Sequence, residues 1–221
     1  MKPFGVKNLL FNVKPPLIGA KIASCGVPMK TGILLFTSST VWSIPAGIKS
    51  FKVTVVGPGG KGGDGGGGGS SGGGGGAGGT CVRFISNFPV NSSAKIVIGN
   101  PGSSTTFDIG TTPYCIASTG VDGGNAQSAP NGTANGGQGG IGILGDLNMQ
   151  GGGGGSGNFY AGNGVQSGSG LGGSSFLGGG GRGSGDATDG VGGGYGSGGS
   201  AGADSGHVGG PGSTGVVMIE Y

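Results

Sequence analysis

Long runs of glycine are the feature that most restricts how this chain can fold. Glycine makes up 66 of the 221 residues, and all but five of these glycines follow residue 56. A glycine tract has no side chains with which to bury apolar surface, and glycine is a poor helix former. The strict Gly-X-Y period of collagen is missing, so a collagen triple helix is excluded.

Disorder and an ordered bundle are the two states left open for such tracts. In the ordered state, polyglycine II, each tract is a polyproline-II-type helix with three residues per turn and a rise of about 3.1 Å. Ordering one residue costs about 1–2 kcal/mol, while an amide hydrogen bond returns about 0.5–1.5 kcal/mol. A single tract should therefore be unfolded. We favour a bundle because the tracts alternate regularly with short turns and because only 9% of the residues are charged.

Short β-prone segments lie between the tracts. Residues 48–56 alternate apolar and polar side chains, and no segment shows a 3.6-residue apolar period of helical length. The expected strands cover residues 33–37, 41–44, 48–56, 80–86, 94–98, 103–107, 114–118 and 216–221. The sequence thus predicts an all-β protein with essentially no α-helix: a small antiparallel sheet or sandwich, capped by a polyglycine-II bundle.

Three regions are expected along the chain. Residues 1–32 carry scattered lysines and two adjacent prolines, which indicates an extended attachment arm. Residues 33–121 form the β-strand region, including a first glycine hairpin at 57–79. Residues 122–221 form the glycine-rich bundle, closed by the strand at 216–221. The residues expected to attach the arm to a larger assembly are Lys7, Lys14, Pro15, Pro16 and Lys21.

The cysteines and the apolar runs bear on where the chain is made. Cys25, Cys81 and Cys115 are few and odd in number, so we expect free thiols and assembly in a reducing cytosol. No apolar run approaches the ~18 residues of a membrane span. Lysines interrupt the first residues too often for a signal peptide.

Counting the crossings of the bundle assigns each turn to one of its two ends. If every tract crosses once, the strands lie at one end and Ser70-Ser71 lies at the other. The same count places apolar turn residues at the strand end, where burial is available, and polar turns at the far end. These apolar residues are Ile141, Ile143, Leu144, Leu147, Phe176 and Leu177, and Tyr195 also falls at the strand end.

Polar and aromatic residues on the far-end turns are the candidates for contact with a partner, since recognition is commonly carried by loops on a rigid scaffold. The candidates are Ser70, Ser71, Asn158, Phe159, Tyr160, Asp186, Asp189, Asp204 and His207. Two alternatives stay open here. Phe159 and Tyr160 could fold back over the bundle, and the three aspartates could form a cation site in place of solvated turns.

Several motif matches lack the context that their chemistry needs. Residues 57–62 match G-x-G-x-x-G, but glycine follows where a dinucleotide fold needs a helix. Ser70 and Ser200 match G-x-S-x-G without the strand–turn–helix of a nucleophile elbow. One histidine and three separated cysteines form no metal cluster, and the dispersed lysines form no nucleic-acid stripe. We expect a non-enzymatic protein with no cofactor, metal, nucleic-acid partner or membrane insertion.

Three segments, in order, carry a resemblance to a known family. They are Val-Thr-Val-Val-Gly at 53–57, GGSSFLGGGGRG at 172–183 and GVVMIEY at 215–221. Over about residues 40–221 the chain resembles the glycine-rich domain of tailed-bacteriophage tail-fibre tips and adhesins. The resemblance implies recognition of a host-cell receptor by turns at the tip of a polyglycine-II bundle. It also implies synthesis in the host cytoplasm and a place at the tail tip or fibre of the virion.

The resemblance leaves several partners and roles open. The receptor could be an outer-membrane protein, a glycan or a pilus, and the other partners would be tail or fibre proteins. Both a homotrimer and a single chain capping a trimeric fibre fit the family. The alternatives are a purely structural tip or spike protein, an ice-binding protein and a disordered glycine-rich protein. An ice-binding protein would need regular Gly-x-x repeats with Ala or Thr faces, which this sequence lacks.

Overall fold

The computed structural model describes residues 32–67, 69–89, 91–127, 134–158, 168–183, 189–203 and 206–221. In these residues the only helix or strand type is the β-strand, which confirms an all-β protein without α-helix. The described residues accordingly include no helix long and apolar enough to cross a membrane.

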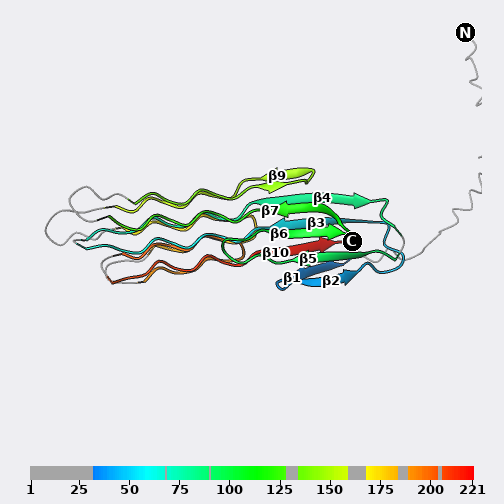
Figure 1. Ribbon diagram of the computed structural model, residues 1–221, viewed down its shortest axis with the longest axis horizontal. Helices are drawn as coiled ribbons and strands as arrows, with labels where there is room; N and C mark the ends of the chain where they lie inside the picture. Colours follow the sequence, from blue (N-terminus) through cyan, green and yellow to red (C-terminus); the bar gives the residue numbers. More distant parts are fainter. Residues whose placement is uncertain are drawn as a thin grey trace, which may run out of the picture.

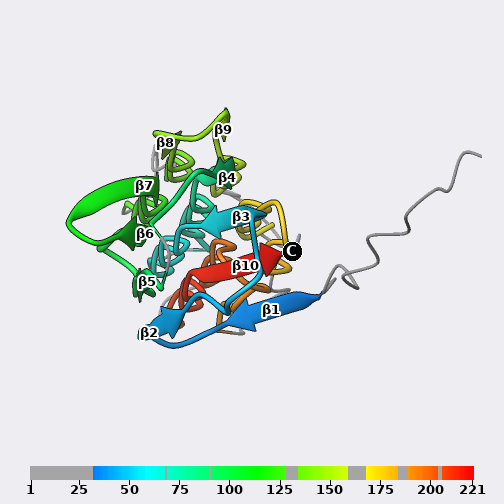
Figure 2. The same ribbon diagram turned by 90° about the vertical axis from the view of Figure 1, so that its right-hand side faces the viewer.

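Ten strands form two antiparallel five-stranded sheets (Figures 1 and 2). Sheet A has the order β1 (Ile33–Phe36), β10 (Val216–Glu220), β3 (Ser50–Val56), β4 (Thr80–Ser86) and β9 (Leu147–Met149). Sheet B has the order β2 (Thr40–Ser43), β5 (Ser93–Val97), β6 (Thr105–Ile109), β7 (Thr112–Ala117) and β8 (Gly142–Ile143).

The two sheets share one hydrophobic core, because alternate residues of their strands point toward each other. Val53 and Val55 of β3 are fully buried there, opposite Ile96 of β5 and Phe107 of β6. On the outer side of β3, Lys52 forms an ion pair with Glu220 of β10. The alternation that predicts a strand at 48–56 thus also tells its inner face from its outer face.

Short connections close both sides of the pair of sheets (Figure 2). Residues 37–39 lead from β1 at the edge of sheet A to β2 at the edge of sheet B. On the opposite side, the turn at 144–146 joins β8 of sheet B to β9 of sheet A. Each sheet therefore ends at a strand that continues directly into the other sheet.

Cys81 and Cys115 form a disulfide, so the prediction of free thiols is wrong for these two residues. Their Cα atoms are 5.8 Å apart, and both side chains are fully buried. Cys81 belongs to β4 and Cys115 to β7, so the bond joins the two sheets across their core. The two cysteines are 34 residues apart in sequence, and only the packing of the sheets brings them together. Cys25 lies outside the described residues.

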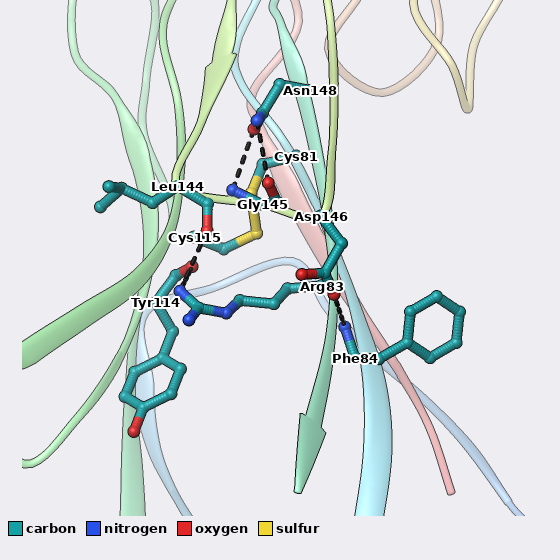
Figure 3. The surroundings of a disulfide bond; sticks show 9 residues. All are labelled: Cys81, Arg83, Phe84, Tyr114, Cys115, Leu144, Gly145, Asp146 and Asn148. Atoms are coloured by element: carbon teal, nitrogen blue, oxygen red, sulfur yellow. Dashed lines mark hydrogen bonds between the residues drawn. A yellow bond between two sulfur atoms is a disulfide. The ribbon is translucent and has the colours of Figure 1, made fainter.

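Arg83 ties the surroundings of this disulfide together (Figure 3). Its Nη1 donates to the carbonyl oxygens of Tyr114 at 2.9 Å and Leu144 at 3.0 Å, and its guanidinium lies 4.8 Å from the centre of the Tyr114 ring. Gly145 lies against the sulfur, since a Cβ at this position would be 2.7 Å from Cys81 Sγ. The turn between β8 and β9 is therefore packed directly on the disulfide.

The glycine tracts all run away from one end of the two sheets (Figure 1). The tracts lie between residues 57 and 215 and are interrupted by the strands β4 to β9. We call the tracts together, without these strands, the glycine region. The tract at 71–79 is fully buried within it. Its successive N–H groups donate to carbonyls of three other segments, at 118–124, 152–158 and 196–202. Its carbonyl groups accept from three more, at 57–63, 137–140 and 170–173. Six of the described segments therefore surround this tract.

The bonds between any two of these segments recur every third residue. Gly73, Gly76 and Gly79, for example, donate to residues of a single neighbour, with N···O distances of 2.8–3.0 Å. The segments are so close that a Cβ at Gly74 would lie 1.9 Å from the carbonyl oxygen of Leu171. Such a distance is impossible for a real side chain, so glycine is required there.

The apolar turns at the strand end are exposed, and the expectation that they would be buried is wrong. Ile141, Leu147 and Phe176 are 53–56% exposed; Ile143 and Leu144 are also exposed, and Leu177 is half-buried. The physical reason is that the strands' own side chains already fill the core between the sheets. The turns are left outside: residues 141–150 form the β8–β9 side of the molecule, and a Cβ on Gly196 would touch Val56 on the outer face of sheet A.

Candidate functional site

The far end of the glycine region, remote from the sheets, is formed by several turns whose backbones are bonded to one another. Gly66 pairs with Ser70 across the first turn, and Gly69 takes a positive φ of 82° there. The Gly65 N–H donates to the carbonyl oxygen of His207 at 2.9 Å. This places the first and the last far-end turns side by side.

Ser70 and Ser71 lie at this end but are fully buried. Ser71 Oγ donates to the carbonyl oxygen of Asn158 at 2.9 Å and accepts from the Asn158 N–H at 3.0 Å. Ser70 Oγ has no hydrogen-bond partner among the described residues. A buried side chain cannot reach a partner in solution, so the two serines are not contact residues. The Ser71 hydroxyl joins the first turn to Asn158, which is itself exposed.

Asp189 and His207 are predicted site residues that the structure brings together. Asp189 Oδ1 lies 3.3 Å from His207 Nδ1 and accepts from the Val208 N–H at 3.0 Å. The Asp189 side chain is 62% exposed and that of His207 is 28% exposed. The pair therefore presents a carboxylate and an imidazole edge to solvent on a backbone that is itself hydrogen-bonded.

A row of four polar side chains lies near the far end, and none of the four was a candidate from the sequence. They are Lys61, Asp64, Asp122 and Asn125. The Lys61 N–H donates to Asp122 Oδ1 at 2.7 Å, and the Asp64 N–H donates to Asn125 Oδ1 at 3.0 Å. Pro58, three residues before Lys61, has no N–H to donate. The two side-chain oxygens thus accept from N–H groups that donate to no backbone carbonyl of the described residues.

The spacing of these residues was the signal that could have revealed them. Lys61 and Asp64 are three residues apart, and so are Asp122 and Asn125. Backbone bonds link the two segments with the same spacing, from Gly123 to Lys61 and from Ala126 to Asp64. Polar residues at a three-residue spacing in glycine tracts therefore lie on one side of each tract.

Asp64 is the most strongly connected charge in this row. Its Oδ1 accepts from Lys61 Nζ and from the Gly209 N–H, both at 2.9 Å. The hydrogen bond from Lys61, followed by that from Gly209, holds the pKa of Asp64 below its ordinary value of 3.8, against a smaller opposing effect of burial. Asp64 is therefore an anion that fastens the last tract to the first.

The remaining predicted residues lie outside the described parts of the chain. At the far end these are Phe159, Tyr160, Asp186 and Asp204; in the expected attachment arm they are Lys7, Lys14, Pro15, Pro16 and Lys21. The candidate site as described thus consists of Asn158, Asp189 and His207, with the row at Lys61 and Asp64 beside them.

The described side chains that match catalytic or metal-site motifs do not lie together. Over the described ranges, no group of three His, Cys, Asp or Glu side chains is close enough to hold a metal ion. Ser200, in a G-x-S-x-G match, is buried, and its Oγ accepts from the Val191 N–H at 2.8 Å. His207 faces Asp189 and not this hydroxyl. The arrangement presents hydrogen-bonding groups and charges on a hydrogen-bonded backbone.

No protein-family model matches the chain, and no curated protein shows significant similarity to it.

Proposed function

We propose that this chain is a non-enzymatic adhesin at the tail-fibre tip of a tailed bacteriophage, with its far end as the receptor-binding surface. In this proposal the tracts form a bundle of polyglycine-II helices on a β-sandwich made by sheets A and B. The arm at residues 1–32 joins other tail or fibre proteins. The far-end turns meet a host-surface receptor.

The single observation that carries the proposal is the hydrogen bonding of the tract at 71–79. Its bonds recur every third residue and go to six surrounding segments, which is what parallel packing of threefold, polyproline-II-type helices requires. Such a scaffold is held mainly by bonds between backbone groups. Its side chains are therefore free to vary at the turns, which suits a protein that must recognise surface molecules.

Two further observations support an extracellular role. The tracts extend from one end of the sheets (Figure 1). Bonds to the first far-end turn place Asn158 and His207 at the opposite end, and Asp189 lies beside His207. The Cys81–Cys115 disulfide suits a protein that works on a virion surface, because disulfides persist in oxidising surroundings. Several weak contacts per virion would add up through avidity.

A purely structural tip protein is the second candidate, and the burial of Ser70 and Ser71 favours it. Adsorption of virions to host cells separates the two functions. The test set is Asp189→Asn, His207→Gln, Phe159→Ala and Tyr160→Ala. Asp189→Asn keeps an oxygen for the Val208 N–H while removing the charge.

The receptor-binding proposal expects at least one of these variants to slow adsorption about tenfold or more. The matched control is Lys95→Gln, which changes a polar residue on sheet B, far from this end. Normal adsorption by every far-end variant, with normal incorporation into virions, would leave only the structural role.

A further inference from the structure

One side of the glycine region leaves backbone groups unpaired at regular intervals. The N–H groups of Leu171 and Ser174 donate to no acceptor among the described residues, and the carbonyl oxygens of Gly153 and Ser156 accept from no donor there. Both pairs have the three-residue spacing of the bonds inside the glycine region. All four residues are exposed. We call this line of unpaired groups the open edge.

The open edge lies where two segments meet. The Gly152 N–H donates to the carbonyl oxygen of Ser174 at 3.1 Å, and the Gly155 N–H donates to that of Leu171 at 2.8 Å. The side chain of Ser174 points away from this meeting line, since its Oγ accepts from the Gly180 N–H at 3.2 Å. The open edge is therefore a surface of backbone groups.

The direction of the unpaired groups follows from the buried tract at 71–79. Gly74 donates its N–H to Gly155, and its carbonyl oxygen accepts from Gly137. A Cβ added to it would point at Leu171, on the other side of its N–H. In Leu171 the carbonyl oxygen likewise accepts from Gly155, and the side chain lies toward Gly183. The Leu171 N–H thus points between the two, to a position that no described segment occupies.

A second line of N–H groups in the glycine region has the same arrangement, but it is capped. Lys61 and Asp64 also lie three residues apart, on a tract that is bonded to the buried one. Their N–H groups donate to the side-chain oxygens of Asp122 and Asn125. Side chains thus take the place of a further backbone segment. Charged side chains block the free edges of β-sheets against other chains in a similar way.

Glycines stand where such caps would be on the open edge. A Cβ added to Gly155 would lie 3.1 Å from the Leu171 nitrogen, and a Cβ added to Gly152 would lie 3.1 Å from the Ser174 nitrogen. Both positions therefore face the unpaired N–H groups, as Asp122 does on the capped line. Glycine is used where another backbone or a ligand must approach closely. The open edge leaves room for one.

We propose that the open edge binds an extended, polyproline-II-type segment of another protein chain. Carbonyl groups of this segment accept from Leu171 and Ser174, and its N–H groups donate to Gly153 and Ser156. A polyproline-II helix repeats every three residues, or about 9.3 Å, which is the spacing of the unpaired groups. The binding is the counterpart of strand addition to a free sheet edge, in which backbone bonds supply the affinity.

The bonding pattern also specifies the composition of the partner segment. Ordering a free glycine chain costs more than its hydrogen bonds return, whereas proline holds a chain in this conformation before it binds. Proline has no N–H, so glycine is needed at every third residue to donate to Gly153 and Ser156. A Gly-Pro-Pro repeat meets both requirements. The open edge depends on the polyglycine-II packing of the proposed function, but not on receptor binding.

An NMR titration of the full chain with the peptide acetyl-(Gly-Pro-Pro)3-amide tests the proposal. The amide signals of Leu171 and Ser174 should shift as the peptide binds, while that of the buried Gly73 should not. The matched peptide has sarcosine in place of glycine, so it lacks every N–H group within its repeats. It should bind at least about fivefold more weakly, because the bonds to Gly153 and Ser156 are lost.

Variants of the open edge test the same binding from the side of the protein. Gly155→Asn supplies a cap for the Leu171 N–H and should weaken binding of the Gly-Pro-Pro peptide at least about tenfold. Gly152→Asn should act likewise. Gly153→Asn is the matched control, because a Cβ there points toward Gly137 and away from the open edge, with 3.6 Å to the nearest atom. It should leave binding unchanged.

Four results would overturn the proposal. They are equal binding of the two peptides, unweakened binding by both capped variants in the folded state, unshifted Leu171 and Ser174 signals at about 10 mM peptide, and a shift of these signals by a soluble oligosaccharide alone. Slow hydrogen exchange of Gly73 and Gly76 in the same samples shows that the glycine region is intact. Virion adsorption reports on receptor binding separately.

Discussion

At the scale of single residues, glycine is required where segments meet and replaceable where a tract faces solvent. Gly74 lies in the buried tract, and an added Cβ would be 1.9 Å from the Leu171 carbonyl oxygen. Gly153 is exposed, and the nearest atom to an added Cβ, the Gly137 carbonyl oxygen, is 3.6 Å away. The same residue type thus serves two different purposes within one kind of tract.

Gly74→Ala is expected to destabilise the protein by about 3 kcal/mol or more, because overpacking forces the backbone apart. Gly153→Ala should be neutral, or stabilising by up to about 1 kcal/mol, since alanine reduces the freedom of the unfolded chain. Urea denaturation of both variants and the wild type makes the comparison. Equal stability of the two variants would contradict the close packing of the tract at 71–79.

Protonation of Asp64 makes the free energy of unfolding depend on pH. Because its folded-state pKa is lowered, its contribution is fully present above its ordinary pKa of 3.8 and is lost as the pH falls through the lower folded value. The Asp64 side chain is 39% exposed, so solvent screening keeps the effect below about 1 kcal/mol. Asp64→Asn should remove this part of the acid sensitivity, as measured by thermal unfolding between pH 5 and pH 2. An unchanged pH profile would show that Lys61 and Gly209 do not stabilise the anion.

At the scale of elements, the two sheets are held by their core and by one covalent bond between β4 and β7. The disulfide, Arg83 and the turn at 144–146 form one connected group (Figure 3). The same strand, β4, continues directly from the buried tract at 71–79. The bond therefore lies where the glycine region is anchored to the sheets.

Replacing Cys81 and Cys115 by alanine should lower the free energy of unfolding by about 3–4 kcal/mol, because the bond closes a long loop in the unfolded chain. Guanidinium denaturation of the double variant measures this. Cys25→Ser is the control, and its stability should equal that of the wild type. A double variant as stable as the wild type would mean that the bond constrains little.

At the scale of the whole molecule, the glycine region and the sheets should behave as one cooperative unit. The tract at 71–79 has no side-chain core of its own and depends on six neighbours, several of which continue into strands. Losing one neighbour leaves its bonds unmade, and a single tract returns too little free energy to stay ordered.

Native-state hydrogen exchange can detect this cooperativity. The amides of Gly73 and Gly76 should exchange with the same free energy as those of Val53 and Val55 in the buried strand β3, because all of them open only in global unfolding. Exchange of the glycine amides at a much lower free energy, with the strands still protected, would show that the glycine region opens independently.

The sequence alone determined the features that depend on local pattern. Glycine tracts and the lack of a 3.6-residue period exclude helices, the alternation at 48–56 places a strand, and the crossing count puts Asp189 and His207 at the end remote from the strands. These conclusions hold because backbone freedom and side-chain alternation are properties of a segment and its immediate neighbours.

Only the tertiary structure decided which distant segments meet. It paired Cys81 with Cys115, buried Ser70 and Ser71, left Ile141 and Phe176 exposed, and matched the row at Lys61 with Asp122. Each of these outcomes depends on strand order and on the packing of tracts far apart in sequence, which composition and spacing do not specify. In a protein whose tracts are joined by backbone bonds, the identity of a glycine says nothing about its partner, so the partners emerge only from the assembled fold.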